Sequence, residues 1–200
     1  MEDSFVDFQD RIDYYCRNLP HMHQEGKYQF VTFHLYDSIP KDAINELQKQ
    51  RSEWIKNHPT PYSYKETIEY RKLFNNKTEE WLDNGYGSCI LADRKIARIV
   101  ADSMHFNDKK HYCLIAYVVM SNHVHVLLET FTMPLANITF AWKSYTSHAI
   151  SKALGCKGRI WHKESWDRLI RNQEHFNNVI RYINKNISQG GILWYFAHTP

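Results

Sequence analysis

The stretch HYCLIAYVVMSNHVHVLLE, residues 111–129, decides the fold. Its first half, His111–Met120, is an apolar run rich in aromatic and β-branched residues, which is typical of a central strand. Ser121 and Asn122 make a tight turn, and residues 123–129 return as the partner strand. The sequence therefore predicts a β-hairpin in the middle of a sheet.

The returning strand carries two histidines, His123 and His125, one residue apart. Side chains alternate between the faces of a strand, so both imidazoles point one way while Val124 and Val126 point the other. Two imidazoles side by side can bind one divalent ion. H-x-H alone is equally compatible with polar residues on a solvated face, and two neutral ligands need a third.

The segments around the hairpin read as alternating strands and helices. KYQFVTFHLYDS, residues 27–38, predicts a strand, and Ser38 is expected to cap a helix that opens at Pro40 and ends at the prolines of 58–63. The aromatic segment 161–170 fits no single element. Further helices are expected over 65–83, 91–105, 135–154 and 172–186, the last capped by Asn172.

This order, β–α–(α)–α–β–β–α–α without Gly-rich phosphate loops, favours an α+β domain in which helices pack on an antiparallel sheet. We expect a single domain over residues 1–200. Within it, residues 1–26 are expected to form an irregular lead-in and about 58–88 a helical insertion.

The composition indicates a globular protein rather than a membrane-spanning or secreted one. The 200 residues, 43% of them hydrophobic, can build a core, and no apolar run reaches the ~20 residues of a membrane span. The acidic N-terminus lacks the pattern of a secretion signal, so we expect a soluble, intracellular protein with no membrane partner. The four cysteines form no C-x-x-C pair, which argues against a zinc ribbon.

Basic residues gather over 143–185, which is compatible with phosphate binding or with a merely solvated surface.

The last predicted helix carries a tyrosine and an asparagine that are candidate site residues. Tyr182 and Asn186 are four residues apart, so they stack on one side of the helix, at the flank of its apolar stripe. Taken alone, Tyr182 is better explained by packing. Beside a metal-bound phosphodiester, however, its oxygen can attack in line and give a covalent phosphotyrosine with a free 3′ hydroxyl. Asn186 would then complete the metal shell.

These residues resemble the REP-associated tyrosine transposases, which belong to the single-tyrosine HUH superfamily. The resemblance spans nearly the whole chain. It is carried by YQFVTFHLYDSIP (28–40), YVVMSNHVHVLLE (117–129), FAWKSYTSHAI (140–150) and WHKESWDRLIRNQEHFNNVIRYINKN (161–186).

The resemblance implies a ferredoxin-like α+β fold and a site-specific single-stranded DNA endonuclease and strand transferase that acts at hairpin-forming repeats. It implies Mg²⁺ or Mn²⁺ bound by His123, His125 and Asn186, with Tyr182 as the nucleophile that forms a 5′-phosphotyrosine. The chain departs from the family pattern at Ser121, where the family has proline, and after Asn186, where Ile187-Ser188 replaces Pro-Val. As a family member it would act on single-stranded or hairpin DNA at the bacterial nucleoid, as a monomer or homodimer.

Five further residues are candidates for DNA contacts. Lys143, Arg168 and Arg171 are expected to contact backbone phosphates, although each is equally well explained as a solvent-facing charge. Trp161 and Trp166 are expected to stack on unpaired bases, with core packing as the alternative for at least one of them.

Two other functions stay open. The first is a non-catalytic nucleic-acid-binding domain that keeps the fold and the basic segment. The second is a metal-dependent hydrolase of small phosphoesters or amides that uses water as its nucleophile. The absence of further Asp or Glu at ligand spacing around His123 and His125 argues against the hydrolase.

Overall fold

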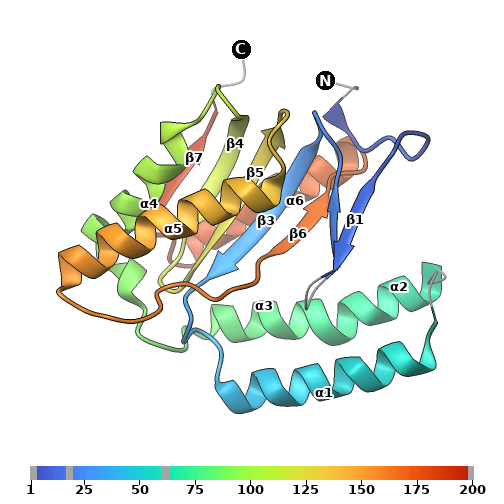
Figure 1. The fold of residues 1–200 in the computed structure, drawn as a ribbon, viewed down its shortest axis with the longest axis horizontal. Coiled ribbons are helices and arrows are strands. Elements are labelled where there is room, and N and C mark those ends of the chain that lie inside the picture. The colour runs from blue at the N-terminus through green and yellow to red at the C-terminus, as the bar shows by residue number, and fades with distance from the viewer. Residues whose placement is uncertain (1–3, 17–19, 60–63, 198–200) are drawn as a thin grey trace.

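A five-stranded antiparallel sheet forms the centre of the molecule, in the order β6-β3-β5-β4-β7 (Figure 1). The computed structural model describes residues 4–16, 20–59 and 64–197. The order β6-β3-β5-β4 is that of a ferredoxin-like β-α-β-β-α-β unit, to which β7 adds an edge strand. The predicted α+β fold is therefore confirmed. The strands are β3 (Tyr28–His34), β4 (Tyr112–Val119), β5 (His123–Thr130), β6 (Trp166–Leu169) and β7 (Leu193–Phe196).

The predicted hairpin is β4 and β5, and it lies in the interior of the sheet. β5 pairs with β4 on one side and with β3 on the other, where His34 faces His123 and Thr32 faces His125. A strand with neighbours on both sides and helices over both faces has no wet face, which explains its unbroken apolar character. The same position takes the two histidines out of solvent.

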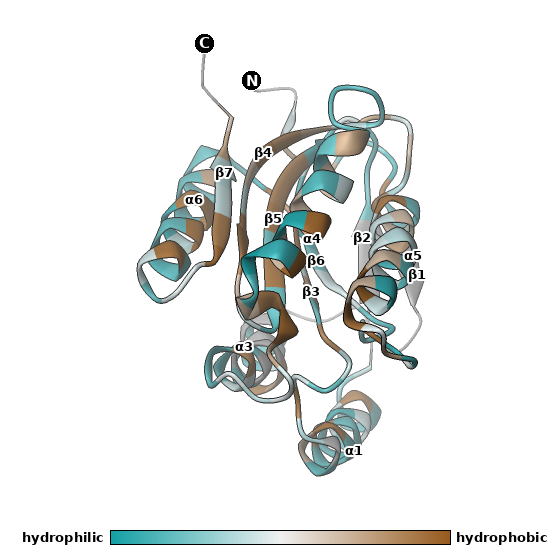
Figure 2. Ribbon diagram, turned by 90° about the vertical axis from the view of Figure 1, so that its left-hand side faces the viewer, coloured by the Kyte–Doolittle hydropathy of each residue, from teal (hydrophilic) through white to brown (hydrophobic). Residues whose placement is uncertain are grey.

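Helices cover both faces of the sheet. α4 (Arg94–Phe106) and α5 (Leu135–Leu154) pack on one face, and α6 (Gln173–Ser188) packs on the other. Figure 2 shows α6 on the opposite side of the strands from α4 and α5. Because side chains alternate, the sheet supplies one core to each side: Val31 and Phe33 face α4 and α5, whereas Phe30 faces α6.

Both ends of α6 are fixed by local contacts. Asn172 caps it as predicted, since its side-chain oxygen accepts from the backbone N–H of His175 at 2.8 Å. At the other end, a Cβ on Gly191 would lie 2.8 Å from Val118 Cγ2 and 2.9 Å from Ile187 Cα. Only glycine therefore lets the chain turn this closely between the helix and β4.

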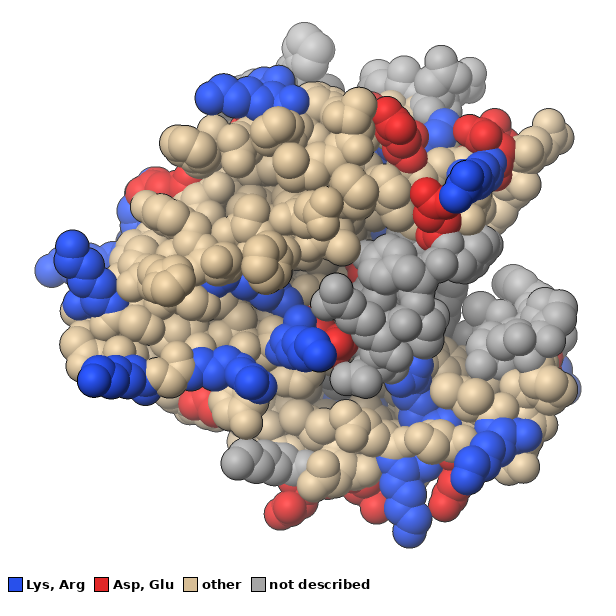
Figure 3. All heavy atoms as spheres, viewed as in Figure 1, with Lys and Arg blue, Asp and Glu red and all other residues tan. Residues whose placement is uncertain are grey.

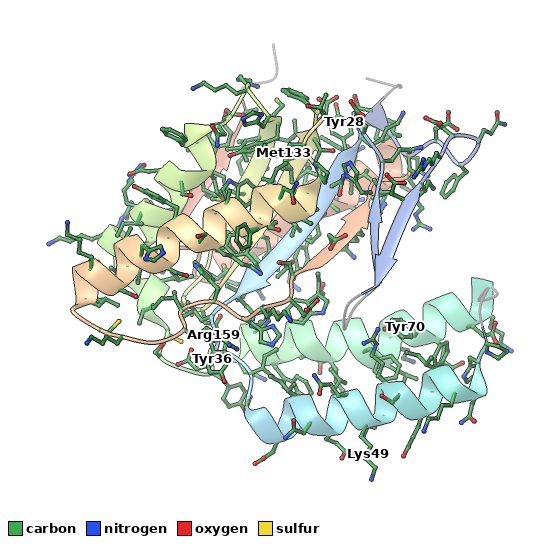
Figure 4. The ribbon with its side chains drawn as sticks, in the orientation of Figure 1. Tyr28, Tyr36, Lys49, Tyr70, Met133 and Arg159 are labelled. Atoms are coloured by element: carbon green, nitrogen blue, oxygen red, sulfur yellow. The ribbon has the colours of Figure 1, made fainter. Side chains whose placement is uncertain are left out.

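A helical insertion separates β3 from α4. It consists of α1 (Lys41–Asn57), α2 (Tyr64–Tyr70), the π-helical turn Arg71–Asn75 and α3 (Asn76–Asp83). Trp54, Tyr70 and Phe74 pack together between these helices, and the insertion lies beyond one end of the sheet (Figures 1 and 4). It includes α1, so it begins earlier than the expected 58–88.

The loop that leads into the insertion also meets the loop after α5. The Arg159 guanidinium lies 4.9 Å from the centroid of the Tyr36 ring, and Figure 4 shows the two side chains together below the sheet. Residues 60–63, part of the predicted break after α1, lie outside the described residues.

Other elements differ from the predictions. Ser38 does not cap α1; its hydroxyl donates instead to the Leu35 carbonyl at 2.8 Å, and α1 begins after Pro40. The lead-in contains a pair of short strands, β1 (Asp13–Cys16) and β2 (Pro20–His23). β6 and β7, of four residues each, are too short to show a period in the sequence. In the part of the chain that the structure describes, no helix has the length and apolarity of a membrane span.

Candidate active site

His123, His125 and Tyr182 meet on the α6 side of the sheet. The Nε2 atoms of His123 and His125 are 3.0 Å apart, and the Tyr182 hydroxyl lies 3.3 Å from His125 Nε2. Both histidines are almost fully buried, whereas Tyr182 is partly exposed. The fold thus brings together three side chains that the sequence separates by up to 59 residues (182 − 123).

The separation of the two Nε2 atoms suits a shared ion. In an octahedral shell with ligands at about 2.1 Å, neighbouring ligand atoms lie about 3.0 Å apart. Among the residues described, however, no group of three or more His, Cys, Asp or Glu side chains is placed to hold a metal ion. Any further protein ligand would have to be a different kind of donor.

Asn122 fixes the tautomer of His123. The Asn122 amide nitrogen donates to the Tyr86 carbonyl at 3.1 Å, so the amide oxygen is the atom 2.7 Å from His123 Nδ1. That oxygen can only accept, and the proton of His123 therefore sits on Nδ1. Nε2 keeps its lone pair and points it at the place between the histidines.

His125 is held by two neighbours. Its Nδ1 lies 2.8 Å from the Thr32 hydroxyl on β3, and its ring stacks on Phe30 with centroids 5.6 Å apart and planes 16° apart. The Tyr182 ring meets both Phe30 and His125 edge-on, at 6.0 and 5.0 Å. Phe30 therefore acts as a common support for the imidazole and the phenol.

Asn186 offers the missing kind of donor. Its amide nitrogen donates to the Tyr182 carbonyl at 3.0 Å, whereas its amide oxygen is buried and has no hydrogen-bond partner in the described structure. A buried acceptor without a partner is costly and calls for a ligand. An amide oxygen is a ligand that suits Mg²⁺ and Mn²⁺, and imidazole nitrogen is a common ligand of divalent metals. His123, His125 and Asn186 are therefore compatible with a divalent ion, and its identity as Mg²⁺ or Mn²⁺ stays a prediction.

Burial sets the protonation of the site. Desolvation lowers the pKa of His123 to about 3, and desolvation, then His123 and Arg168, lower that of His125 far below its usual range. Both are neutral near pH 7, the form that binds metal. Burial also raises the pKa of Tyr182, so its phenol carries a proton.

Several charged and polar groups surround the phenol. The carboxylates of Glu79 and Asp83, on α3 of the insertion, raise the pKa of Tyr182 further, while Asn186 and Arg168 lower it. The acidic side chains of α3 therefore act electrostatically on the phenol, which nothing in the sequence pattern of 65–83 indicates.

Of the predicted DNA contacts, Arg168 and Trp166 lie on the same side of the sheet as the histidines. The Arg168 guanidinium sits 4.8 Å from the centroid of Phe30, and the Trp166 ring stacks on His34 at 4.7 Å. Arg171 is exposed just before α6.

Lys143 and Trp161 lie on the α5 side and make internal contacts. The Lys143 ammonium donates to Ser165 Oγ at 2.7 Å, the Glu164 carbonyl at 3.0 Å and the His162 carbonyl at 3.2 Å, and burial lowers its pKa to about 8. Trp161 is 4% exposed and donates to Thr146 Oγ1 at 2.8 Å. In this structure Trp161 is a core residue with no free face for a base, which corrects the expectation of stacking.

Among the described residues, the surface over α5 is mostly uncharged. Figure 3 shows Lys and Arg at the margins of a broad area of uncharged side chains over α5. The basic segment 143–185 is therefore divided between the two sides of the sheet, since Lys143 and Arg168 lie on opposite sides.

Sequence reasoning missed four residues that shape the site: Thr32, Asn122, Glu79 and Phe30. Asn122 directly precedes the histidine pair, but the sequence pattern indicates only that it is a turn residue. The other three come from elements whose pairing with β5 and α6 cannot be read from spacing.

The chain was compared with protein families, curated proteins and solved structures. No protein-family model matches the chain, and no curated protein matches it. Among solved structures, one of a REP-associated tyrosine transposase bound to a REP hairpin is 17% identical, over 85% of this chain and 72% of that one, with a TM-score of 0.41. At this identity and TM-score the likeness does not establish membership of that family.

Proposed function

We propose that this protein is a single-stranded DNA endonuclease and strand transferase that uses Tyr182 as its nucleophile. One observation carries the proposal: the Tyr182 hydroxyl lies 3.3 Å from His125 Nε2, which is itself 3.0 Å from His123 Nε2. A phenol beside two neutral, converging imidazoles is the constellation that phosphodiester transfer to tyrosine needs.

The reaction exchanges one phosphate ester for another. The Tyr182 oxygen bonds to phosphorus and loses its proton, while the bond from phosphorus to the 3′ oxygen breaks. The 3′ oxygen takes up a proton and leaves as a hydroxyl, and the 5′ phosphate remains on the tyrosine. Attack by another 3′ hydroxyl reverses these steps and joins a new strand, so no nucleotide cofactor is consumed.

His123, His125 and Asn186 would hold Mg²⁺ or Mn²⁺, which when bound neutralises the phosphate charge that repels a nucleophile. The remaining residues position the phenol. Tyr182 stands edge-on to Phe30 and His125, so its ring has little freedom to turn. Its partial burial limits the access of water to the phosphotyrosine, which favours strand transfer over hydrolysis.

A panel of labelled hairpin oligonucleotides with single-stranded flanks, incubated with Mn²⁺, tests the proposal. We expect a covalent protein–DNA adduct that survives denaturing electrophoresis. Tyr182→Phe should abolish the adduct, while Tyr145→Phe, at an exposed tyrosine on α5, should leave it unchanged.

The competing functions predict different results in the same assay. A binding domain would shift the oligonucleotides without cleaving them and would be indifferent to His123→Ala. A water-using hydrolase would release product from a generic phosphoester, without an adduct and independently of Tyr182. Either result would replace the transferase.

A further inference from the structure

The environment of Arg168 places a guanidinium within the candidate site. Arg168 on β6 is directly opposite Phe30 on β3, and its guanidinium lies 4.8 Å from the centroid of that ring. The same ring stacks on His125 and receives the edge of Tyr182. The cation, the imidazole and the phenol are therefore arranged around one aromatic side chain.

Arg168 is incompletely satisfied within the protein. Its Nε atom is buried and has no hydrogen-bond partner in the described part of the chain. An N–H removed from water without an acceptor destabilises the fold, and natural proteins keep few such groups. The unpaired Nε–H of Arg168 lies near the Tyr182 nucleophile, and a bound ligand that accepts its hydrogen bond would explain why it has no partner in the protein.

The charges that face Arg168 limit what that ligand can be. Arg168 lowers the pKa of the Glu79 carboxyl, on α3, against the raising effect of burial. The guanidinium also lowers the pKa values of His125 and Tyr182. Glu79 and Asp83 are the carboxylates that act on the phenol, and Arg168 is the cation that acts against them. Beside a neutral histidine pair, its open Nε–H is suited to an anionic acceptor.

We propose that Arg168 is a catalytic residue that binds the nonbridging oxygens of the scissile phosphate while Tyr182 attacks it. The proposal rests on the proposed function. Arginine presents a planar fork of N–H donors that matches two phosphate oxygens, and its charge cannot be lost by deprotonation. Packed over Phe30, the fork is held in place before DNA arrives, so little freedom is lost on binding.

A purely structural role for Arg168 has a different signature. If the guanidinium served only to pack on Phe30 and to balance Glu79, its removal would weaken all DNA contacts equally or would unfold the site. A phosphate receptor instead loses one specific contact, to a single charge on the DNA.

The test combines a protein change with a DNA change. The scissile phosphate is first mapped from the adduct, and oligonucleotides are then made with either the natural phosphate or a neutral methylphosphonate at that position. Their affinities are measured by fluorescence anisotropy in EDTA, which removes any contribution of a divalent ion. Tyr182→Phe serves as the background, so that nothing is cleaved.

We expect the methylphosphonate to weaken binding by about tenfold when Arg168 is present and by less than about twofold after Arg168→Ala, because the two changes remove the same contact. Arg181→Ala, at an exposed arginine of α6, should keep the full tenfold penalty. Arg168→Gln, which keeps the length of the side chain without its charge, replaces Arg168→Ala if the latter lowers the melting temperature.

The possible failures are distinguishable. If no hairpin in the panel forms an adduct with the parent protein, the transferase itself is refuted and the role of Arg168 with it. If the adduct forms but the methylphosphonate penalty is the same with and without Arg168, only the role of Arg168 is refuted.

Discussion

At the scale of single residues, the candidate site depends on polar partners that hold its imidazoles. Asn122 uses both ends of its amide, the nitrogen on the Tyr86 carbonyl and the oxygen on His123 Nδ1. The two contacts select one tautomer and aim the Nε2 lone pair at His125. Such outer partners commonly change metal affinity by 10- to 100-fold.

Asn122→Ala should remove this selection. In metal-free protein we expect the ¹⁵N signals of the His123 ring to change from those of the Nδ1–H tautomer to those of a mixture, and Mn²⁺ affinity to fall by about 10- to 100-fold. Asn122→Asp keeps an acceptor at the same place and should keep the tautomer. Unchanged ring signals in the alanine variant would refute the assignment.

Burial of the histidines predicts a dependence of stability on pH. Burial lowers the pKa values of His34, His123 and His125 below the ordinary 6.5. As pH falls through 6.5, the unfolded chain takes up protons that the folded protein does not. Stability should therefore drop by about 1.4 kcal/mol per pH unit for each histidine, and these groups should have no effect above about pH 7.5.

Urea unfolding in EDTA at pH 7.5 and 5.5 measures this effect. The double variant His123→Asn, His125→Asn should show a clearly smaller loss between the two pH values, because only His34 of the three remains. Equal losses in parent and variant would mean that the pair is not buried in its neutral form.

Some of the candidate site residues could be predicted from the sequence, and others could not. Alternation along one strand was enough to place His123 and His125 on a common face, and the helical wheel placed Tyr182 at the rim of the core. The roles of Thr32 and Phe30 depend on the register between β3 and β5, which spacing along the chain does not contain. Trp161 was misassigned because an aromatic side chain can stack equally well on a base or in a core.

At the scale of elements, the site exists because α6 docks on the face of the sheet that carries the histidines. Its apolar stripe and the Asn172 cap were readable from the sequence, and both are confirmed. β6 could not be predicted from the sequence, because its four residues are too few to show the alternation of a strand. Its pairing with β3 joins segments that are far apart in the chain. Arg168 reaches the site through that pairing.

The segment that precedes β6 is tied to α5 by Lys143. Lys143→Met would leave the His162 and Glu164 carbonyls without their donor, and we expect it to lower the free energy of unfolding by about 2–3 kcal/mol. Lys152→Met, at an exposed position of the same helix, should change it by less than about 0.5 kcal/mol. Urea unfolding measures both; equal effects would show that the Lys143 contacts do not stabilise the fold.

At the scale of the whole molecule, the insertion α1–α3 is joined to the site after α3, and its two ends meet each other. Its last residues lead to Tyr86, which holds Asn122, and Gly87 passes against Asp37 at the end of the β3 connection. The sequence predicted helices here but not their place, because the attachment depends on backbone contacts rather than on a pattern of side chains.

Gly87→Ala should disturb this attachment. A Cβ at Gly87 would lie 2.5 Å from the Asp37 carbonyl oxygen, and φ there is +90°, so we expect a loss of about 2–4 kcal/mol in unfolding free energy and weaker Mn²⁺ binding. Gly85→Ala has φ of +68° and no atom within 4 Å, and should cost only about 1 kcal/mol. Comparable losses for the two variants, by urea unfolding, would argue against a tight contact at Gly87.

In the proposed reaction, the Tyr182 oxygen is the atom that takes the phosphate. Trypsin cleaves after Arg181 and Lys185, so Tyr182 lies in a peptide of four residues, Tyr182–Lys185. After reaction with a hairpin oligonucleotide and nuclease trimming, tandem mass spectrometry should find the 5′-phosphonucleotide on this peptide, at the tyrosine. A nucleotide on any other peptide, or cleaved DNA with no modified peptide, would contradict it.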